Sequence, residues 1–305
     1  MVNKRLKIAG IVLGSLALIA LGALLAIAND KASQLVHNPL AERDPIDESP
    51  GDYGLDFQTV SLTTEDGLRL AAWYVPSRNG AAVIALHGYK SDREEMLEEA
   101  AMLARHGYGV MLIDLRAHGL SDGDLITFGL LEVRDMDAAY RYLLTRPEVD
   151  AERIGALGNS MGASTALLYA AQNPHIKAVV ADSAYASLAN EVASGVQRIT
   201  GLPPFPFAPL IQFFAEQQTG YRVGQVAAVE HIDEISPRPV FLLQGGADTS
   251  VAPDSGQQLY AAAGEPRELW FDPQLEHVEF SIKRAGEYET RVIAFFDRYL
   301  LGKQP

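Results

Sequence analysis

Residues 154–164 read Ile-Gly-Ala-Leu-Gly-Asn-Ser-Met-Gly-Ala-Ser, an apolar run that enters a Gly-x-Ser-x-Gly turn and leaves as an Ala- and Leu-rich segment. This pattern predicts a nucleophile elbow, in which a strand, a sharp turn and a helix hold one serine hydroxyl above a sheet edge. Gly158 and Gly162 lack side chains, so the strand and the helix can approach closely. Ser160 is therefore the candidate nucleophile. With 26 glycines in 305 residues such a string can also arise by chance, so its context matters.

Strand-like and helical segments alternate on both sides of this turn. Strands are predicted at 81–86, 110–114, 154–158, 178–182, 240–245 and 267–271, helices at about 91–106, 130–146, 161–173, 255–263 and 287–301, and a hairpin at 57–63 and 68–75. The continuous apolar runs are typical of strands covered on both faces. The alternation predicts an α/β fold with a mostly parallel central sheet and helices on both faces.

The N-terminus contains a long apolar segment. Lys4, Arg5 and Lys7 precede a run that lasts to Ala28, which is long enough to span a bilayer. We expect residues 1–28 to be a transmembrane anchor that contacts the membrane through residues 6–28. The basic flank predicts that the folded domain lies on the extracytoplasmic side. The alternative is a signal segment that is cleaved near Ala28, which would release a secreted protein.

The rest of the chain divides into a tether and one folded domain. Residues 29–54 are rich in proline and acidic side chains, as expected of an exposed tether. Residues 55–305 are expected to form the domain, with a helical cap insertion at about 187–236, where the strand rhythm stops. This insertion contains a proline-rich apolar stretch in which Phe205 and Phe207 are candidate walls of a substrate pocket. The alternative is a surface excursion that does not touch substrate.

Composition excludes several classes of function. The net charge of −14 leaves no basic patch of useful size, so no nucleic-acid partner is expected. The absence of cysteine excludes disulfides, thiolate metal sites and a cysteine nucleophile. Metalloprotease, phosphate-loop and dinucleotide-binding motifs do not occur, so neither a metal nor another cofactor is expected. No sequence feature indicates an oligomeric state.

A serine nucleophile needs a base and a carboxylate that orients the base. Asp248 follows the strand at 240–245, and His277 follows the strand at 267–271. Both should therefore lie at the sheet edge that carries Ser160. Asp182 also ends a strand and is an alternative acid.

An oxyanion that develops during the reaction needs two N–H donors. The backbone N–H of Met161, directly after the nucleophile, is one candidate, and that of Tyr89, after the strand at 81–86, is the other. His87, Asp114 and His118 are expected to shape neighbouring loops. Lys90 is expected to face solvent.

The pieces that carry a family resemblance are His87-Gly88-Tyr89, the stretch from Asp114 to Ser121, the turn from Gly158 to Gly162, the stretch from Gln244 to Asp248, and His277. From Phe57 to Leu301 the sequence resembles the α/β-hydrolase superfamily, in which nucleophile, acid and histidine follow in this order. It looks most like serine hydrolases of the esterase and thioesterase type with an N-terminal membrane anchor. Two departures are Glu276 and Ala163, where relatives often have glycine.

This resemblance implies hydrolysis of a small acyl substrate, a carboxylic ester or thioester, through an acyl-enzyme on Ser160. Two alternatives remain open. One is a serine peptidase of the aminopeptidase or acyl-peptidase type, and the other is a non-catalytic envelope binding protein of the same fold. The apolar cap stretch favours selection on an uncharged acyl chain.

Overall fold

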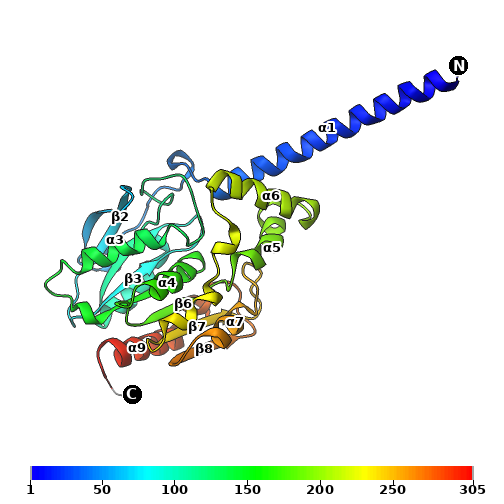
Figure 1. The fold of residues 1–305 in the computed structure, drawn as a ribbon. Coiled ribbons are helices and arrows are strands. Elements are labelled where there is room, and N and C mark those ends of the chain that lie inside the picture. The colour runs from blue at the N-terminus through cyan, green and yellow to red at the C-terminus, as the bar shows by residue number, and fades with distance from the viewer. Residues whose placement is uncertain (1, 304–305) are drawn as a thin grey trace. The chain divides into compact units, whose positions relative to one another are not determined.

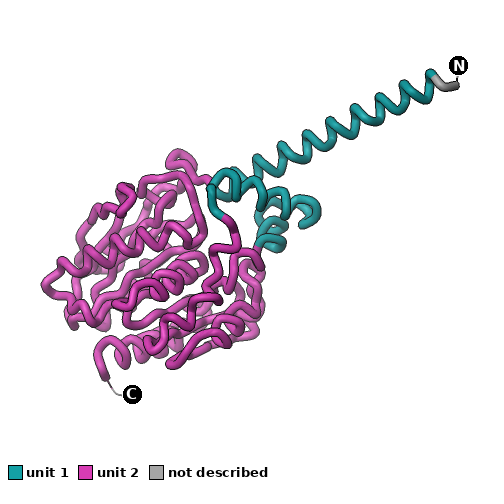
Figure 2. The backbone as a smooth tube through the Cα atoms, viewed as in Figure 1, with its two compact units in different colours: residues 1–36, 192–221 teal, residues 37–191, 222–305 magenta. Residues whose placement is uncertain are grey.

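The computed structural model describes residues 2–303 (Figure 1). The strands are β1 (Gln58–Thr63), β2 (Arg69–Val75), β3 (Ala82–Leu86), β4 (Gly109–Ile113), β5 (Ile154–Asn159), β6 (Val179–Asp182), β7 (Val240–Gly245) and β8 (Arg267–Asp272). The α-helices are α1 (Val2–Val36), α2 (Leu97–Arg105), α3 (Val133–Leu143), α4 (Met161–Gln172), α5 (Leu188–Thr200), α6 (Pro204–Thr219), α7 (Ser255–Ala262), α8 (Phe280–Lys283) and α9 (Ala285–Leu300). The chain divides into two compact units, residues 1–36 with 192–221 and residues 37–191 with 222–305 (Figure 2).

The second unit contains one eight-stranded sheet in the order β1-β2-β4-β3-β5-β6-β7-β8. The hairpin β1–β2 and the pair β2–β4 are antiparallel, and the neighbours from β4 to β8 are parallel. Every residue of β3, β4, β5, β6 and β7 is buried, as their continuous apolar runs predict. The predicted α/β-hydrolase fold is confirmed. Because the central strands are parallel, their carboxyl ends meet at one edge of the sheet.

Helices cover both faces of this sheet. Side chains alternate across a strand, so Ile84 of β3 packs in one core and its neighbours Val83 and Ala85 pack in the other. The first core includes side chains of α3, α4 and α7, and the second includes side chains of α2 and α9. The strand ends are thus held between two apolar layers.

Residues 37–54, which were expected to form an exposed tether, belong to the second unit, the sheet unit, and are hydrogen-bonded to its loop at residues 117–124. The backbone N–H of Asn38 donates to the Asp124 carbonyl at 2.8 Å, and its side-chain amide donates to the Ala117 carbonyl at 2.8 Å. The Arg43 guanidinium donates to the carbonyls of His118 and Ser121, at 3.2 and 2.6 Å, and to those of Gly119 and Gly123. This segment therefore follows the surface of the sheet unit as a strap.

The first unit consists of α1 with most of α5 and all of α6 (Figure 2). Helix α1 is long and apolar enough to cross a membrane by length and composition, a property that it shares with signal sequences. The helix continues past the expected boundary at residue 28 to Val36. The continuation has a packing reason, because Ala28 and Ala32 are fully buried against side chains of α5 and α6.

Candidate active site

Ser160 lies on the turn between β5 and α4. Its backbone adopts φ 53° and ψ −114°, a left-handed conformation that is strained for a residue with a side chain. A Cβ atom at Gly158 would lie 2.5 Å from the Gly162 carbonyl carbon, and one at Gly162 would lie 2.3 Å from the Leu86 carbonyl oxygen. The two glycines therefore allow α4 to start directly over the ends of β3 and β5, and the serine side chain remains partly exposed.

Asp248 and His277 form a hydrogen-bonded pair at the same edge of the sheet. The Asp248 Oδ2 atom lies 2.8 Å from His277 Nδ1. The Oδ1 atom accepts the backbone N–H groups of Ser250 and Val251, at 2.7 and 2.9 Å. The aspartate is 4% exposed, whereas the histidine side chain is 23% exposed. The arrangement places the Nδ1 proton on the aspartate side and leaves Nε2 as the basic ring nitrogen.

The end of β6 lies between the serine turn and the histidine loop. The backbone N–H of Ser160 donates to the Asp182 carbonyl at 2.8 Å. The Ser183 hydroxyl accepts the N–H of Val278 at 3.1 Å and donates to the Asp182 carboxyl at 2.9 Å. Burial raises the pKa of Asp182 to about 8, so this carboxyl is protonated at neutral pH. A neutral acid paired with Ser183 is poorly suited to stabilise an imidazolium.

The loop after β3 approaches the serine from the other side. A Cβ atom on Gly88 would lie 3.6 Å from Ser160 Cβ. The Tyr89 ring stacks on Phe128 with centroids 5.1 Å apart, which fixes the loop at the position of the candidate N–H donor. Met161, the other candidate, is the first residue of α4, where backbone N–H groups have no partner within the helix.

Glu95 connects this loop to the serine turn, a role that sequence reasoning missed. Its carboxylate accepts the backbone N–H of Gly88 at 3.1 Å and the side-chain amide of Asn159 at 3.2 Å. One carboxylate thus bridges a residue beside Tyr89 and the residue before Ser160. A lone glutamate in a helical segment gives no sequence signal for such a contact.

His87, Asp114 and His118 lie behind the loop and bind backbone groups. Leu115 N–H donates to His87 Nε2 at 3.0 Å, and His87 Nδ1 lies 2.7 Å from the Gly88 carbonyl. Burial lowers the pKa of His87 to about 4, so the ring is neutral. Asp114 accepts the N–H of Leu120 at 2.8 Å and pairs with the Arg93 guanidinium. These contacts shape loops, as the sequence indicated.

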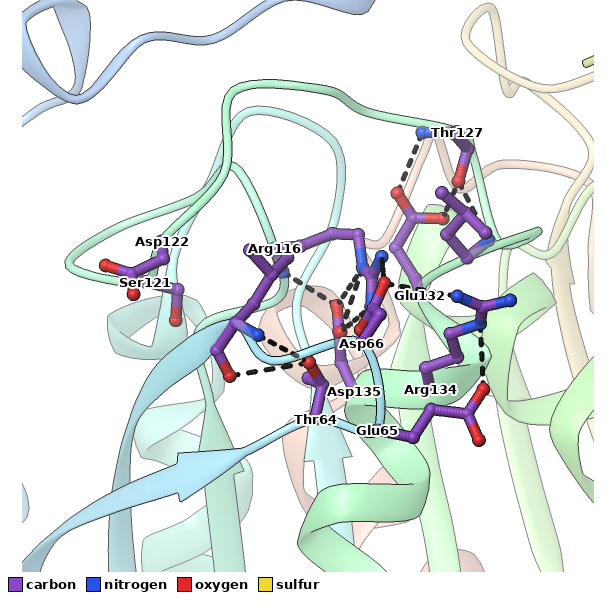
Figure 3. Close-up of polar contacts among 12 residues, drawn as sticks. Thr64, Glu65, Asp66, Arg116, Ser121, Asp122, Thr127, Glu132, Arg134 and Asp135 are labelled. Atoms are coloured by element: carbon purple, nitrogen blue, oxygen red, sulfur yellow. Dashed lines mark hydrogen bonds and ion pairs between the residues drawn. The ribbon is translucent and has the colours of Figure 1, made fainter. Parts of the chain in front are cut away.

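A buried ion-pair network holds the chain that leaves β4 (Figure 3). The Arg116 guanidinium lies 2.7 Å from Asp135 and 2.9 Å from Asp66, which also pairs with Arg134 at 3.2 Å. Burial raises the pKa of Asp135 to about 7, whereas hydrogen bonds from Arg116 hold that of Asp66 below its usual range. The network fixes the connection between β4 and α3.

The two candidate pocket residues belong to the first unit. Phe205 is 82% exposed. Phe207 is partly buried and packs against the cluster that Ala28 and Ala32 form with α5 and α6. Their role in binding substrate stays a prediction. Within residues 2–303, no group of three or more His, Cys, Asp or Glu side chains is arranged to hold a metal ion.

Comparison with known proteins identifies the family to which this chain belongs. The model of the Hydrolase_4 family, described as serine aminopeptidase S33, matches residues 77–227. The uncharacterized protein Rv2307c of Mycobacterium tuberculosis is 30% identical over 269 residues, which cover 87% of each chain. The chain belongs to the α/β-hydrolase superfamily.

Two further proteins, one of them with a crystal structure, are similar to this chain. The uncharacterized protein YfhR of Escherichia coli K12 is 26% identical, over 82% of this chain and 84% of its own. The crystal structure of the Pyrococcus furiosus esterase Pf2001 superposes with a TM-score of 0.73 and 30% identity, covering 87% of this chain and 98% of that one. The protein is accordingly a serine hydrolase of α/β fold with a structure similar to that of an esterase.

Proposed function

We propose that the protein hydrolyses carboxylic esters or thioesters of small acyl substrates through an acyl-enzyme on Ser160. The observation that carries the proposal is the 2.8 Å hydrogen bond between Asp248 and His277, at the sheet edge that also carries the strained Ser160 turn. The likeness to the esterase Pf2001 supports an ester as substrate.

The proposed reaction has two stages. His277 Nε2 takes the proton of the Ser160 hydroxyl while the Oγ atom attacks the acyl carbon, and the imidazolium that forms is stabilised by Asp248. The backbone N–H groups of Tyr89 and Met161 bind the resulting oxyanion. The oxyanion collapses, and the leaving alcohol or thiol takes the proton from His277. A water molecule, deprotonated by the same ring, then attacks the acyl carbon. The bond from this carbon to Oγ breaks, His277 returns the proton to Ser160, and the acid is released.

A serine peptidase is the second candidate, because the matching family model is described as a serine aminopeptidase. The two activities share the same triad and differ in the leaving group. An amide must be held in register by directed hydrogen bonds, whereas an ester has a better leaving group and tolerates looser positioning. Esters of graded chain length and aminoacyl anilides therefore discriminate the two candidates.

We also propose that α1 anchors the protein in a membrane, with the hydrolase unit on the extracytoplasmic side. The apolar length of α1 and its basic N-terminal flank support this proposal. If the full-length chain is expressed and the protein is recovered from the medium with Asn29 as its first residue, the segment is instead a cleaved signal sequence.

The decisive experiment is labelling with a fluorophosphonate probe, followed by kinetics on p-nitrophenyl esters and aminoacyl anilides. We expect the wild type to be labelled and Ser160→Ala to be neither labelled nor active. Ser61→Ala, at an exposed position on β1, is the matched control and should behave as wild type. Esterase activity of Ser160→Ala at the wild-type level would eliminate the mechanism. A higher kcat/KM for anilides than for every ester would favour the peptidase.

A further inference from the structure

Residues 192–221, the part of the insertion that belongs to the first unit, pack on the end of the apolar N-terminal helix. Ala28 and Ala32 of α1 are fully buried in one cluster with Val196 of α5 and with Ala208 and Ile211 of α6, which are 2–6% exposed. Small side chains on α1 let the helices approach closely. This packing fixes which part of α1 the insertion contacts (Figure 2).

A polar contact also fixes the position of α6 along α1. The Gln218 side-chain amide of α6 donates to the Asn29 carbonyl at 3.2 Å and to the Asn29 side-chain oxygen at 3.0 Å. Asn29 is the first polar residue after the apolar run. The insertion therefore meets α1 at the point where its apolar segment ends.

The apolar segment before this point has the length of a bilayer core. At 1.5 Å per residue, residues 6–27 extend about 33 Å, against about 30 Å of hydrocarbon. Their large side chains are exposed within the described chain, for example Leu16 at 56% and Ile19 at 68%. With residues 6–27 inside the bilayer, Ala28 and Asn29 lie at its surface, and the helices packed against them lie there too.

The insertion has the side chains of a membrane-surface element. Phe205 is 82% exposed, Phe213 54% and Ile199 48%. Residues 192–221 carry only two charged side chains, Arg198 and Glu216, in a chain with a net charge of −14. Exposed apolar side chains on a nearly uncharged segment mark an interaction surface, and apolar side chains of helices that lie on a membrane are buried at the boundary between headgroups and acyl chains.

We propose that residues 192–221 dock on the phospholipid bilayer that α1 crosses, with Ile199, Phe205 and Phe213 inserted at the boundary between headgroups and acyl chains. This inference rests on the proposed anchoring by α1. The occupant is the bilayer because the insertion is packed on the residues that emerge from it. The insertion is then a surface element of the membrane-bound enzyme, held at a fixed depth by its contacts with Ala28, Asn29 and Ala32.

The absence of cysteine permits a clean test in the full-length protein. Single cysteines at Leu16, Phe205, Phe213 and Ile282 would each carry one nitroxide label in phosphatidylcholine nanodiscs. Collisions with oxygen, which concentrates in lipid, and with a water-soluble nickel chelate report the depth of each label. Ile282 is 70% exposed in the sheet unit and is the aqueous control, whereas Leu16 is the membrane control. Fluorophosphonate labelling of Ser160 in the same samples reports the catalytic proposal separately.

We expect the labels at positions 205 and 213 to collide with nickel at least threefold less often than the label at 282, and with oxygen more often. Nickel collisions equal to those at 282, with position 16 protected, would overturn docking and leave anchoring intact. Protection from both reagents would mean that protein, such as a second copy, covers the surface, and would also overturn the proposal. An accessible label at position 16 would refute anchoring and docking together.

Discussion

Replacing Asp248 by asparagine changes one oxygen of a carboxylate into an N–H donor and tests the proposed triad. In the wild type, Oδ1 accepts two backbone N–H groups, and Oδ2 accepts the proton on His277 Nδ1 and, at 3.3 Å, the side-chain amide of Gln244. An asparagine oxygen can replace only one of these acceptors. With the oxygen on the backbone side, the new NH2 group faces Nδ1, and the ring must carry its proton on Nε2. That tautomer cannot accept the proton of Ser160.

The alternative rotamer limits the size of the loss. Turning the amide over restores the correct tautomer, but the NH2 group then faces the N–H groups of Ser250 and Val251. Each unsatisfied buried donor costs about 1–3 kcal/mol, so this rotamer lies about 2–6 kcal/mol higher. At 1.36 kcal/mol per tenfold, its population is roughly 3 × 10⁻² to 4 × 10⁻⁵. We therefore expect kcat to fall by about 30-fold to 3 × 10⁴-fold.

The assay is kcat for a p-nitrophenyl ester at neutral pH, with the thermal midpoint of unfolding measured in parallel. Asp182→Asn is the matched control, because this residue is also a buried aspartate at the end of a strand and its carboxyl is already neutral. We expect Asp182→Asn to retain kcat within a factor of about three. A loss of less than tenfold for Asp248→Asn, in a normally folded protein, would refute the assignment of the acid.

The Asp182→Asn variant should also alter the pH dependence of stability. The pKa of Asp182 is raised to about 8, so the folded state keeps a proton that the unfolded state releases near pH 4. The free energy of unfolding of the wild type therefore falls as pH rises between these values, by up to about 1.36 kcal/mol per pH unit. Measured by urea unfolding at pH 5 and pH 8, the free energy of unfolding should fall less in Asp182→Asn than in the wild type. Equal falls in the two proteins would contradict the burial argument. Arg116→Met leaves Asp135 buried without its partner and should lower the free energy of unfolding by about 3–5 kcal/mol, with partial recovery on adding Asp135→Asn; a loss below about 1 kcal/mol would show that the ion pair is dispensable. Glu95→Gln turns an NH2 group toward either the Gly88 N–H or the Asn159 amide and should displace the oxyanion loop, which lowers kcat by about 10- to 100-fold with KM and the thermal midpoint little changed. The control Glu98→Gln, at an exposed position on α2, should have no effect. Equal kcat in both variants would exclude this positioning role.

Local patterns were sufficient to predict the fold. Buried strands such as β3 and β7 are continuous apolar runs, and the glycines around Ser160 are required by the crossing of β5 and α4. The order of strands and helices also predicted that Asp248 and His277 lie at one sheet edge, and the structure has them hydrogen-bonded. Their catalytic role stays a prediction.

Contacts between distant segments could not be predicted in this way. Glu95 binds Asn159 across 64 residues of sequence, and no periodicity encodes such a pair. Residues 37–54 have the proline and acidic content of a tether, and that composition does not reveal that Arg43 finds carbonyl acceptors on another loop. Helix α1 likewise continues to Val36 because α5 and α6 cover it, a tertiary effect absent from the apolar run itself.

The Arg43 strap has a consequence for where the hydrolase unit can be cut from its N-terminal helix. The loop from His118 to Gly123 has several carbonyl groups turned toward a single guanidinium, which is half-buried among them. A fragment that starts at Phe57 would leave those carbonyls to water and free the loop to sample other conformations. A fragment that starts at His37 keeps the arginine together with its acceptors, so we expect it to hold this loop in its native conformation.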